Sequence, residues 1–290
     1  MEELARAKIN LYLHVTGKRP NGYHTLCSLV MFADMGDRVS LAPAEHFALT
    51  VTGPFAPAIQ QISLHENIID KAAHALATAC GRRLDFAITL EKNLPVGSGI
   101  GGGSADAAAV IRLMLRFWGI TPDDVPDFDA LLLSLGADVP MCFYSRTLHA
   151  GGVGEDVTRL PDQPSFYAVL IYPDTTVSTA DIFRQYSANT LKAAPIDTAH
   201  LNTLRTADDV ITFLRDTDNH LASASTALYP QITDALAIAG DQAGVLLHRM
   251  SGSGSCCFAL CRTHGDAVAA AQAIKEAYPS WWVQTCLLGE

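Results

Sequence analysis

Apolar and polar residues alternate along the first segment of the chain, residues 5–15 (ARAKINLYLHV). Successive side chains of a β-strand point to opposite faces of the sheet, so this alternation predicts a strand. It places Lys8, Asn10, Tyr12 and His14 on one face of that strand. Polar side chains so arranged are either exposed to solvent or gathered at a site, and the alternation alone leaves both interpretations open.

The next segment predicts a tight turn and a second strand. Residues 16–24 (TGKRPNGYH) are rich in turn formers, and the Asn21-Gly22 step favours a sharp reversal. The mostly apolar residues 26–33 follow and predict a strand. Tyr23 and His24 therefore lie in a loop, either as ordinary loop residues or as ligand contacts.

The rest of the chain mixes both kinds of pattern, which indicates an α+β protein. Apolar runs bounded by turn residues predict strands, and longer amphipathic stretches with start and stop signals predict helices. The predicted strands cover residues 84–90, 167–172, 246–250 and 256–261, and the predicted helices cover residues 64–80 and 127–135, with a polar, helix-prone region at 184–218.

A glycine-rich loop joins the strand at 84–90 to an alanine-rich helix. It passes through Pro95 and the glycine-rich stretch Gly97–Gly103 before the helix begins. Glycine tolerates positive φ and allows close backbone approach, and a helix N-terminus presents N–H groups and partial positive charge. The loop therefore predicts a phosphate site. The alternative is a glycine-rich hairpin without a ligand.

Two known phosphate motifs fit this loop poorly. The P-loop requires lysine after its glycines, whereas Ser104-Ala105-Asp106 follow here. The dinucleotide fingerprint matches Gly97, Gly99 and Gly102, but no acidic residue ends a second strand about 20 residues further on. A third pattern, P-x-x-x-G-[LI]-G-G-G-S-x-D-A-A, matches residues 95–108.

A carboxylate follows a helix stop in the middle of the chain. Gly136 is positioned as a C-cap glycine after the helix at 127–135, and Asp138 stands between it and an apolar run. A buried carboxylate needs a cation or hydrogen-bond donors. Asp138 is therefore either a cap or turn residue or a functional group, and Lys8 is the attractive partner for the second interpretation.

Two small-residue segments complete the pattern. Residues 251–255 (SGSGS) form either a tight turn between strands or a loop that approaches anionic groups through its N–H donors. We expect the second, with a role in shaping the active site. The Pro-flanked residues 161–164 predict a boundary between two domains, residues 1–160 and 161–290.

Composition and charge limit the classes of function. The chain has 290 residues, 49% of them hydrophobic, which is ample for a globular core. We expect a soluble protein, because neither a signal-peptide pattern nor a membrane-length apolar run is present. A net charge of −10 argues against a nucleic-acid surface. Its seven cysteines are scattered without metal-ligand spacing, which favours free buried thiols in a reducing cytoplasm.

Several motifs occur together and in order, and with them the chain resembles the GHMP kinases, named for galactokinase, homoserine kinase, mevalonate kinase and phosphomevalonate kinase. Within that family it is similar to the cytidyl-specific members. The motifs are AKINLYLHVTGKRPNGYH, PVGSGIGGGSADAA, LGADVP, GGVGE and MSGSGSCCFAL.

The resemblance implies a two-domain GHMP kinase fold. The N-terminal, ATP-binding domain would be related to ribosomal protein S5 domain 2 and the C-terminal domain to ferredoxin-like folds, with the active site in the cleft between them. It implies transfer of the ATP γ-phosphoryl to the 2-hydroxyl of a cytidine diphosphate-linked methylerythritol, in the non-mevalonate route to isoprenoid precursors. A monomer or homodimer is expected, without nucleic-acid or membrane partners.

The resemblance also implies roles for individual residues. Lys8 and Asp138 match the catalytic pair, in which Asp138 accepts or orients the hydroxyl proton and Lys8 keeps it ionised. The substrate-binding residues implied are Asn10, Tyr23, His24, Val153, Thr179 and Phe183, with Tyr23 and Phe183 stacking on cytosine, and Asn219 matches a family asparagine. The ATP-binding residues implied are Pro95, Val96, Gly97, Ser98, Gly99, Ile100, Gly101, Gly102, Gly103, Ser104, Ala105, Asn67 and Lys92.

Two residues depart from the family pattern, and two other functions compete with this assignment. Ala105 stands where many relatives have a second serine, and Ser98 replaces a glycine or alanine. Mg²⁺ is expected with ATP, but it keeps waters and needs few protein ligands, so no metal ligand is predicted. Another GHMP kinase would lack a reason for Tyr23-His24, and a non-catalytic sensor would not need Lys8 and Asp138.

Overall fold

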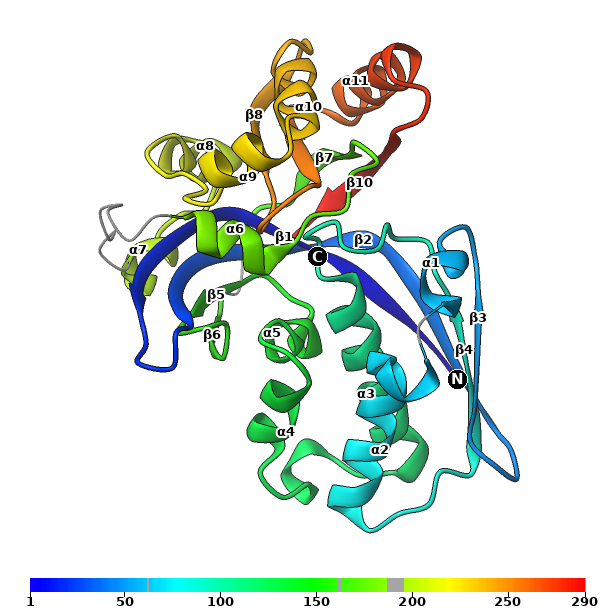
Figure 1. Cartoon of the computed structure of the whole chain (residues 1–290). Coiled ribbons are helices and arrows are strands. Elements are labelled where there is room, and N and C mark those ends of the chain that lie inside the picture. Colours follow the sequence, from blue (N-terminus) through cyan, green and yellow to red (C-terminus); the bar gives the residue numbers. More distant parts are fainter. Residues whose placement is uncertain (62, 161–162, 187–195, 290) are drawn as a thin grey trace. The chain divides into compact units, whose positions relative to one another are not determined.

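The computed structural model describes residues 1–61, 63–160, 163–186 and 196–289 (Figure 1). Residues 161–162 of the predicted boundary and residues 187–195 of the predicted helix-prone region lie outside the described residues. The chain forms two compact units. The first unit contains Met1–Ala7, Met35–Val96 and Gly101–Ser145, and the second contains Lys8–Asp34, Gly97–Ile100 and Arg146–Glu290. The boundary near residue 161 stays a prediction.

The first unit contains a small mixed sheet. Strand β4 (Phe86–Glu91) pairs antiparallel with the end of β2 (His24–Pro43) and parallel with β3 (Ala48–Thr52). Phe86, Ile88 and Leu90 of β4 are buried, and the residues between them are more exposed. This period of two is the pattern that predicted the strand, and the structure confirms it.

Helices cover the rest of the first unit, and they occupy cyan to green positions in Figure 1. Helix α2 packs against α3, and α5 packs against both α3 and α4. Nearly every residue of α3 from Ala105 to Leu115 is buried, so its small alanines allow the neighbouring helices to approach closely. The helices are α1 (Ala56–Gln60), η1 (Leu64–Glu66), α2 (Ile68–Cys80), α3 (Gly102–Trp118), η2 (Pro122–Asp124), α4 (Phe128–Leu135) and α5 (Val139–Tyr144).

The second unit is built on an antiparallel sheet in the order β10-β7-β9-β8. Its core gathers residues of these strands with small residues of two helices, α10 and α11. Strand β5 pairs with β2 and with β6. The further elements are β1 (Glu2–Lys18), β5 (Leu148–Gly151), β6 (Asp156–Arg159), β7 (Phe166–Tyr172), α6 (Thr179–Gln185), α7 (Thr198–Leu201), α8 (Ala207–Arg215), α9 (Ala222–Leu228), α10 (Gln231–Gly240), β8 (Val245–Met250), β9 (Cys257–Cys261), α11 (His264–Ala277) and β10 (Trp282–Leu288).

Element boundaries differ from the predicted ones in three places. The first two strands are longer than predicted, and β2 continues through Gly36, where an added Cβ would lie 2.0 Å from the Ala5 carbonyl oxygen. The helix predicted at 64–80 is divided, because Asn67 is extended and its side chain caps α2 by accepting from Ile69 N at 2.9 Å. The apolar run after Asp138 forms α5.

All seven cysteines are free, as predicted, and all but Cys80 are buried. Among the described residues, the helices are too short or too polar to span a membrane.

Two histidines join β1 to the segment before α9. His14 Nε2 accepts from Asp218 N at 3.2 Å, and His220 Nδ1 accepts from Val15 N at 3.1 Å. The two rings stack with centroids 4.4 Å apart. Burial, followed by the neighbouring His220, lowers the pKa of His14 to about 4. Both imidazoles act as acceptors here, so the joint requires their neutral forms.

We expect this joint to weaken in mild acid. The folded-state pKa of His14 lies below its ordinary 6.5, so the unfolded chain binds the proton more tightly and stability falls as the pH drops from about 6.5 toward 4. Urea unfolding at pH 7, 6 and 5 measures the loss. Because glutamine does not titrate, the variant His14→Gln should lose less stability over this range than the wild type. Equal losses would assign the effect to other groups.

Candidate active site

The glycine-rich loop contributes to both units. Gly97–Ile100 belongs to the second unit, whereas Gly101 and the start of α3 belong to the first. Gly97, Gly99 and Gly101 have φ of 68°, 76° and 69°, a region that other residues rarely adopt. Gly101 is the N-cap of α3 and supplies no side-chain cap. The first-turn N–H groups are therefore suited to an anionic ligand.

In the second unit, residues 251–255 pack directly on the loop. Cys256 N donates to Ser98 O at 2.9 Å, and a Cβ on Gly99 would lie 2.4 Å from Gly254 O. A Cβ on Gly97 would lie 2.6 Å from Thr176 Cγ2. The glycines thus serve close backbone packing between the two loops as well as positive φ. This contact supports the prediction that residues 251–255 shape the site.

Lys8 belongs to a buried chain of hydrogen bonds that begins on β1. Its side chain is 3% exposed, and Nζ donates to Asn10 Oδ1 at 2.9 Å. Asn10 Nδ2 in turn donates to Ser28 Oγ at 2.8 Å. Lys8 N donates to Ile100 O at 2.8 Å, which fixes the strand against the glycine loop. The structure confirms that Lys8 and Asn10 share one face.

Asn219 and Thr179 hold the 251–255 loop. Asn219 Nδ2 donates to Met250 O and Gly252 O, both at 2.8 Å. Thr179, the first residue of α6, has its Oγ 2.9 Å from Ser253 Oγ. Side chains from separate segments therefore determine the conformation of the loop that packs on the glycines.

Asp138, in the first unit, occupies the N-cap position of α5. Its backbone carbonyl accepts from Cys142 N at 3.0 Å, but its carboxylate makes no capping hydrogen bond. Side-chain capping by this half-buried carboxylate is therefore excluded, whereas the predicted turn is present at residues 137–138. Arg112 of α3 holds α5 by donating to the carbonyls of Cys142 and Phe143 at 2.8 and 3.0 Å. Arg112 therefore holds the turn that carries Asp138 against α3, the helix that follows the glycine loop.

An aromatic cluster surrounds His24 in the second unit. Phe183 of α6 stacks on its imidazole with ring centroids 5.0 Å apart and planes 20° apart, and Tyr186 meets it edge-on at 6.0 Å. Burial and the nearby Lys18 lower the pKa of His24, which favours the neutral ring. Tyr23, by contrast, is 63% exposed at the turn. The cluster combines a flat apolar face with an imidazole able to donate and accept hydrogen bonds.

The turn around Val153 is tied to the β1–β2 loop. Val153 N donates to Glu155 Oε2 at 2.5 Å, and Glu155 also forms an ion pair with Arg19. Leu26 N donates to Gly152 O at 2.6 Å. These contacts link the turn that contains Val153 to the residues that flank Tyr23 and His24. Two predicted substrate-binding segments are therefore tied together.

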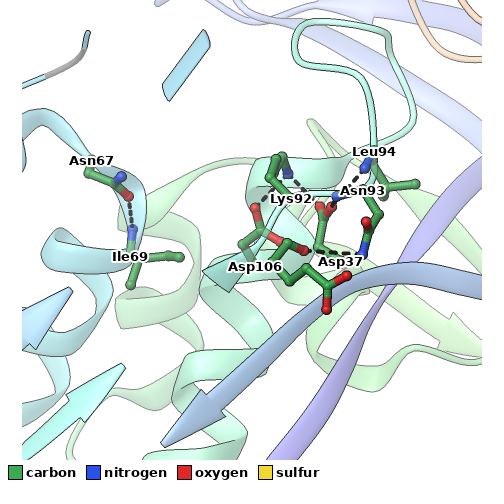
Figure 2. Close-up of polar contacts among 8 residues, drawn as sticks. Asp37, Asn67, Ile69, Lys92, Asn93, Leu94 and Asp106 are labelled. Atoms are coloured by element: carbon green, nitrogen blue, oxygen red, sulfur yellow. Dashed lines mark hydrogen bonds and ion pairs between the residues drawn. The ribbon is translucent and has the colours of Figure 1, made fainter. Parts of the chain in front are cut away.

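Asn67 and Lys92 of the predicted ATP set are both engaged inside the first unit (Figure 2). Asn67 caps α2, and its side chain is largely buried. Lys92 is 2% exposed, and Nζ forms ion pairs with Asp37 and, at 2.7 Å, with Asp106. Direct contacts of Asn67 and Lys92 with adenosine stay predictions.

Sequence reasoning missed several residues of these networks. They are not marked by any local motif, although Asp37 interrupts an otherwise strand-like run and Arg112 lies in an apolar helix, which are signals of buried polar groups. The missed residues are Ser28, Asp37 and Arg112. Among the described residues, no group of three or more His, Cys, Asp or Glu side chains is arranged to hold a metal ion.

Family models match both halves of the chain. The model of the GHMP kinases N terminal domain matches residues 67–146, which include the glycine loop and Asp138. The model described as GHMP kinases C terminal matches residues 199–280. The two-domain α+β GHMP kinase fold predicted from the sequence is therefore confirmed.

Two relatives match nearly the whole chain. The 4-diphosphocytidyl-2-C-methyl-D-erythritol kinase of Parvibaculum lavamentivorans is 43% identical over 99% of this chain and 98% of its own length. The protein of the same name from Cereibacter sphaeroides is 44% identical, with 97% of each chain covered.

Solved structures of GHMP kinases also resemble this chain. A crystal structure of 4-(cytidine 5′-diphospho)-2C-methyl-D-erythritol kinase superimposes with a TM-score of 0.79 at 30% identity over the whole of both chains. Homoserine kinase from Cytophaga hutchinsonii has a TM-score of 0.71 at 20% identity, with 99% of this chain and 93% of its own chain covered, and shares the fold alone. From the full-length identities and the glycine loop, the chain belongs to the 4-diphosphocytidyl-2-C-methyl-D-erythritol kinase family of GHMP kinases.

Proposed function

We propose that this protein is a small-molecule kinase that transfers the γ-phosphoryl of ATP to the 2-hydroxyl of 4-diphosphocytidyl-2-C-methyl-D-erythritol. The products are the 2-phosphate and ADP, and the step belongs to the methylerythritol phosphate route to isoprenoid precursors. The observation that carries the proposal is identity above 40% to named relatives over nearly the full chain. The His24–Phe183 stack supports the cytidyl acceptor.

The reaction forms one P–O bond and breaks another. The substrate 2-hydroxyl oxygen attacks the γ-phosphorus, and the bond to the β,γ-bridging oxygen breaks as ADP leaves. We propose that Asp138 orients this hydroxyl and takes its proton. Lys8 would stabilise negative charge on the transferred phosphoryl group. Phosphoryl transfer passes through a loose transition state, so positioning and charge stabilisation carry most of the catalysis.

The glycine loop and the start of α3 supply the phosphate site in this proposal. Backbone N–H groups of residues 95–105 and the helix dipole would bind the ATP phosphates. The positive φ values at Gly97, Gly99 and Gly101 support this, because they turn successive N–H groups into a concave arrangement.

Mg²⁺ is proposed to arrive with the nucleotide. It neutralises the charge of the β- and γ-phosphates when it is bound, and it usually keeps several waters with few protein ligands. A donor set without a cluster of three or more ligating side chains among the described residues fits that kind of ion. The protein's own contribution would be to hold the phosphates and the acceptor in line.

At the acceptor end, we propose that the His24 imidazole reads the edge of cytosine while Phe183 and Tyr23 provide stacking surfaces. In the structure, Phe183 already stacks on His24. Thr179, Asn10 and the backbone of Val153 would complete the substrate contacts. Buried hydrogen bonds to a base edge reject other bases, because a mismatch leaves polar groups unpaired.

We further propose a cytoplasmic enzyme that acts as a monomer or a homodimer, without nucleic-acid or membrane partners. Free thiols, most of them buried, fit a reducing compartment. The net charge of −10 disfavours phosphate backbones as macromolecular partners.

ATP-dependent turnover with parallel acceptors tests the function. Purified protein is assayed with 4-diphosphocytidyl-2-C-methyl-D-erythritol, mevalonate and homoserine, and the phosphorylated product is identified by ³¹P NMR. Turnover of the cytidyl acceptor alone is expected. Turnover of another acceptor would assign the chain to a different GHMP activity, and ATP and cytidyl binding without turnover would indicate a sensor.

Replacing Phe183 with leucine is expected to raise the KM for the cytidyl substrate. Stacking of a base on an aromatic ring is worth about 1–3 kcal/mol, so the increase should be about 5- to 150-fold. The KM for ATP should not change. The matched control is Tyr278→Leu, which removes a ring from the Tyr278–Trp281 stack in the same unit and should leave both KM values unaltered. An unchanged cytidyl KM in Phe183→Leu would contradict the base-site assignment.

A further inference from the structure

A buried ion cluster in the first unit contacts the residues at both ends of the glycine loop. Lys92 follows β4 and places Nζ between two carboxylates, Asp37 of β2 and Asp106 of α3 (Figure 2). The three side chains are exposed by 2%, 0% and 2%, respectively. Burying three ionisable groups together costs free energy, because each loses its hydration. Such a cluster therefore needs a structural or functional reason. The catalytic assignments above do not explain them.

The cluster holds the chain where it enters the loop. Asp37 Oδ1 accepts from Asn93 N at 2.5 Å and from Leu94 N at 2.8 Å, which are the two residues before Pro95. Its other oxygen accepts from Lys92. A single carboxylate therefore fixes the backbone of two consecutive residues leading into the phosphate loop and the side chain of the residue before them.

The cluster also holds the chain where it leaves the loop. Lys92 Nζ donates to Asp106 Oδ2, just after the first turn of α3. A Cβ on Gly102, the first residue of α3, would lie 3.1 Å from the same ammonium and 3.7 Å from Asp37 Oδ2. The ammonium thus packs under the helix N-terminus whose N–H groups face the proposed phosphates.

Lys92 is itself presented from a rigid backbone. Its N–H donates to Thr52 O at 2.7 Å, and its carbonyl accepts from Phe55 N at 3.1 Å. A Cβ on Gly53 would lie 2.7 Å from the Lys92 backbone, so the residue that follows β3 is packed tightly against it. The ammonium has little freedom to follow a displaced loop.

We propose that Asp37, Lys92 and Asp106 are positioning residues that join both ends of the glycine loop and set the affinity for the ATP phosphates. The inference rests on the proposed function. Lys92 would act through the loop conformation, and the acceptor side of the reaction would be independent of it.

The two carboxylates should contribute unequally to the affinity for the nucleotide. Asp37 makes hydrogen bonds with Lys92 and two backbone N–H groups, whereas Asp106 Oδ1 is buried without a hydrogen-bond partner. Burial, together with the nearby Asp37 charge, raises the pKa of Asp106 in spite of Lys92. Asparagine also presents an oxygen that can accept from Lys92 Nζ at this position. An amide at position 106 should therefore be tolerated.

Four variants test this: Lys92→Met, Asp37→Asn, Asp106→Asn and the double variant Lys92→Met/Asp37→Asn. Dissociation constants for a non-hydrolysable ATP analogue are measured by calorimetry, together with both KM values and the thermal midpoint. Lys92→Met and Asp37→Asn should raise Kd and KM for the nucleotide at least 10-fold, with the cytidyl KM unchanged. Asp106→Asn should stay within about 3-fold of the wild type.

The double variant separates positioning from stability. It removes the opposite charges together, so its thermal midpoint should exceed that of Lys92→Met, while its nucleotide Kd should remain at least 10-fold raised. A purely structural cluster would lower thermal midpoints and leave nucleotide Kd and KM unchanged in the folded fraction, which would overturn the proposal. An Asp106→Asn defect equal to that of Asp37→Asn would overturn the proposed inequality. Absence of wild-type turnover with intact ATP binding would refute the function alone.

Discussion

Asp138→Ala is expected to lower kcat on the cytidyl substrate by about 10²- to 10⁴-fold, the usual contribution of a positioned acid or base. Asp138 is half-buried at the start of α5, and its carboxylate does not cap that helix. Removal should therefore leave α5 intact and should leave both KM values within a few-fold of the wild type. Steady-state kinetics and a thermal unfolding curve measure the two effects separately.

A second substitution at this position distinguishes two roles. Asparagine retains an oxygen that can orient the hydroxyl but is far too weak a base to accept its proton. If Asp138 chiefly orients the acceptor, Asp138→Asn should retain at least 10-fold more activity than Asp138→Ala. If it must take the proton, the two variants should be equally impaired. Asp129→Asn on the exposed first turn of α4 is the matched control, and full activity in Asp138→Ala would contradict the catalytic assignment.

Lys8→Met is the second large effect, with an expected decrease in kcat of about 10²- to 10³-fold, as found when one donor to a developing charge is removed. Methionine keeps most of the apolar stem but lacks the ammonium. Because Lys8 Nζ also donates to the buried Asn10 Oδ1, the variant leaves that oxygen without this donor, at a cost of about 1–3 kcal/mol of stability. Kinetics measured well below the thermal midpoint separate the catalytic loss from the loss of stability.

The control for Lys8 is Lys71→Met, which removes an exposed lysine from α2 and should change neither kcat nor the thermal midpoint. Lys8→Arg keeps the charge but replaces the compact ammonium with a planar fork, so only partial recovery is expected. Turnover by Lys8→Met equal to that of the control would exclude Lys8 from the chemistry.

The sequence pattern predicted an element correctly where the residues that determine the element lie close together in the chain. Gly136 was predicted to end a helix and does so as the C-cap of α4. The alternation in β1 placed Lys8 and Asn10 together, and the hydrogen bond between them confirms it. The glycine run was predicted to lead into a helix, and α3 begins at Gly102. In each case the deciding interactions lie within a few residues along the chain.

Boundaries were wrong where distant contacts decide. The strand that begins near residue 26 continues to Pro43, because its second part pairs with β4, some 50 residues further on. A propensity pattern does not contain this distant partner. The helix predicted at 64–80 is interrupted for a local reason, because Asn67 caps α2 by accepting from Ile69 N.

By itself, the sequence determined the α+β class and, through resemblance, the kinase family, and it predicted a phosphate site at the glycine loop, because these depend on local periodicity, glycine content and ordered motifs. Only the tertiary structure decided how these parts are held. Asp37 and Lys92 lie 55 positions apart in the chain, and Asn10 and Ser251 lie 241 apart, yet both pairs are in hydrogen-bonding contact. Such contacts arise when folding buries polar groups that must then find partners, and no local pattern specifies which partners they find.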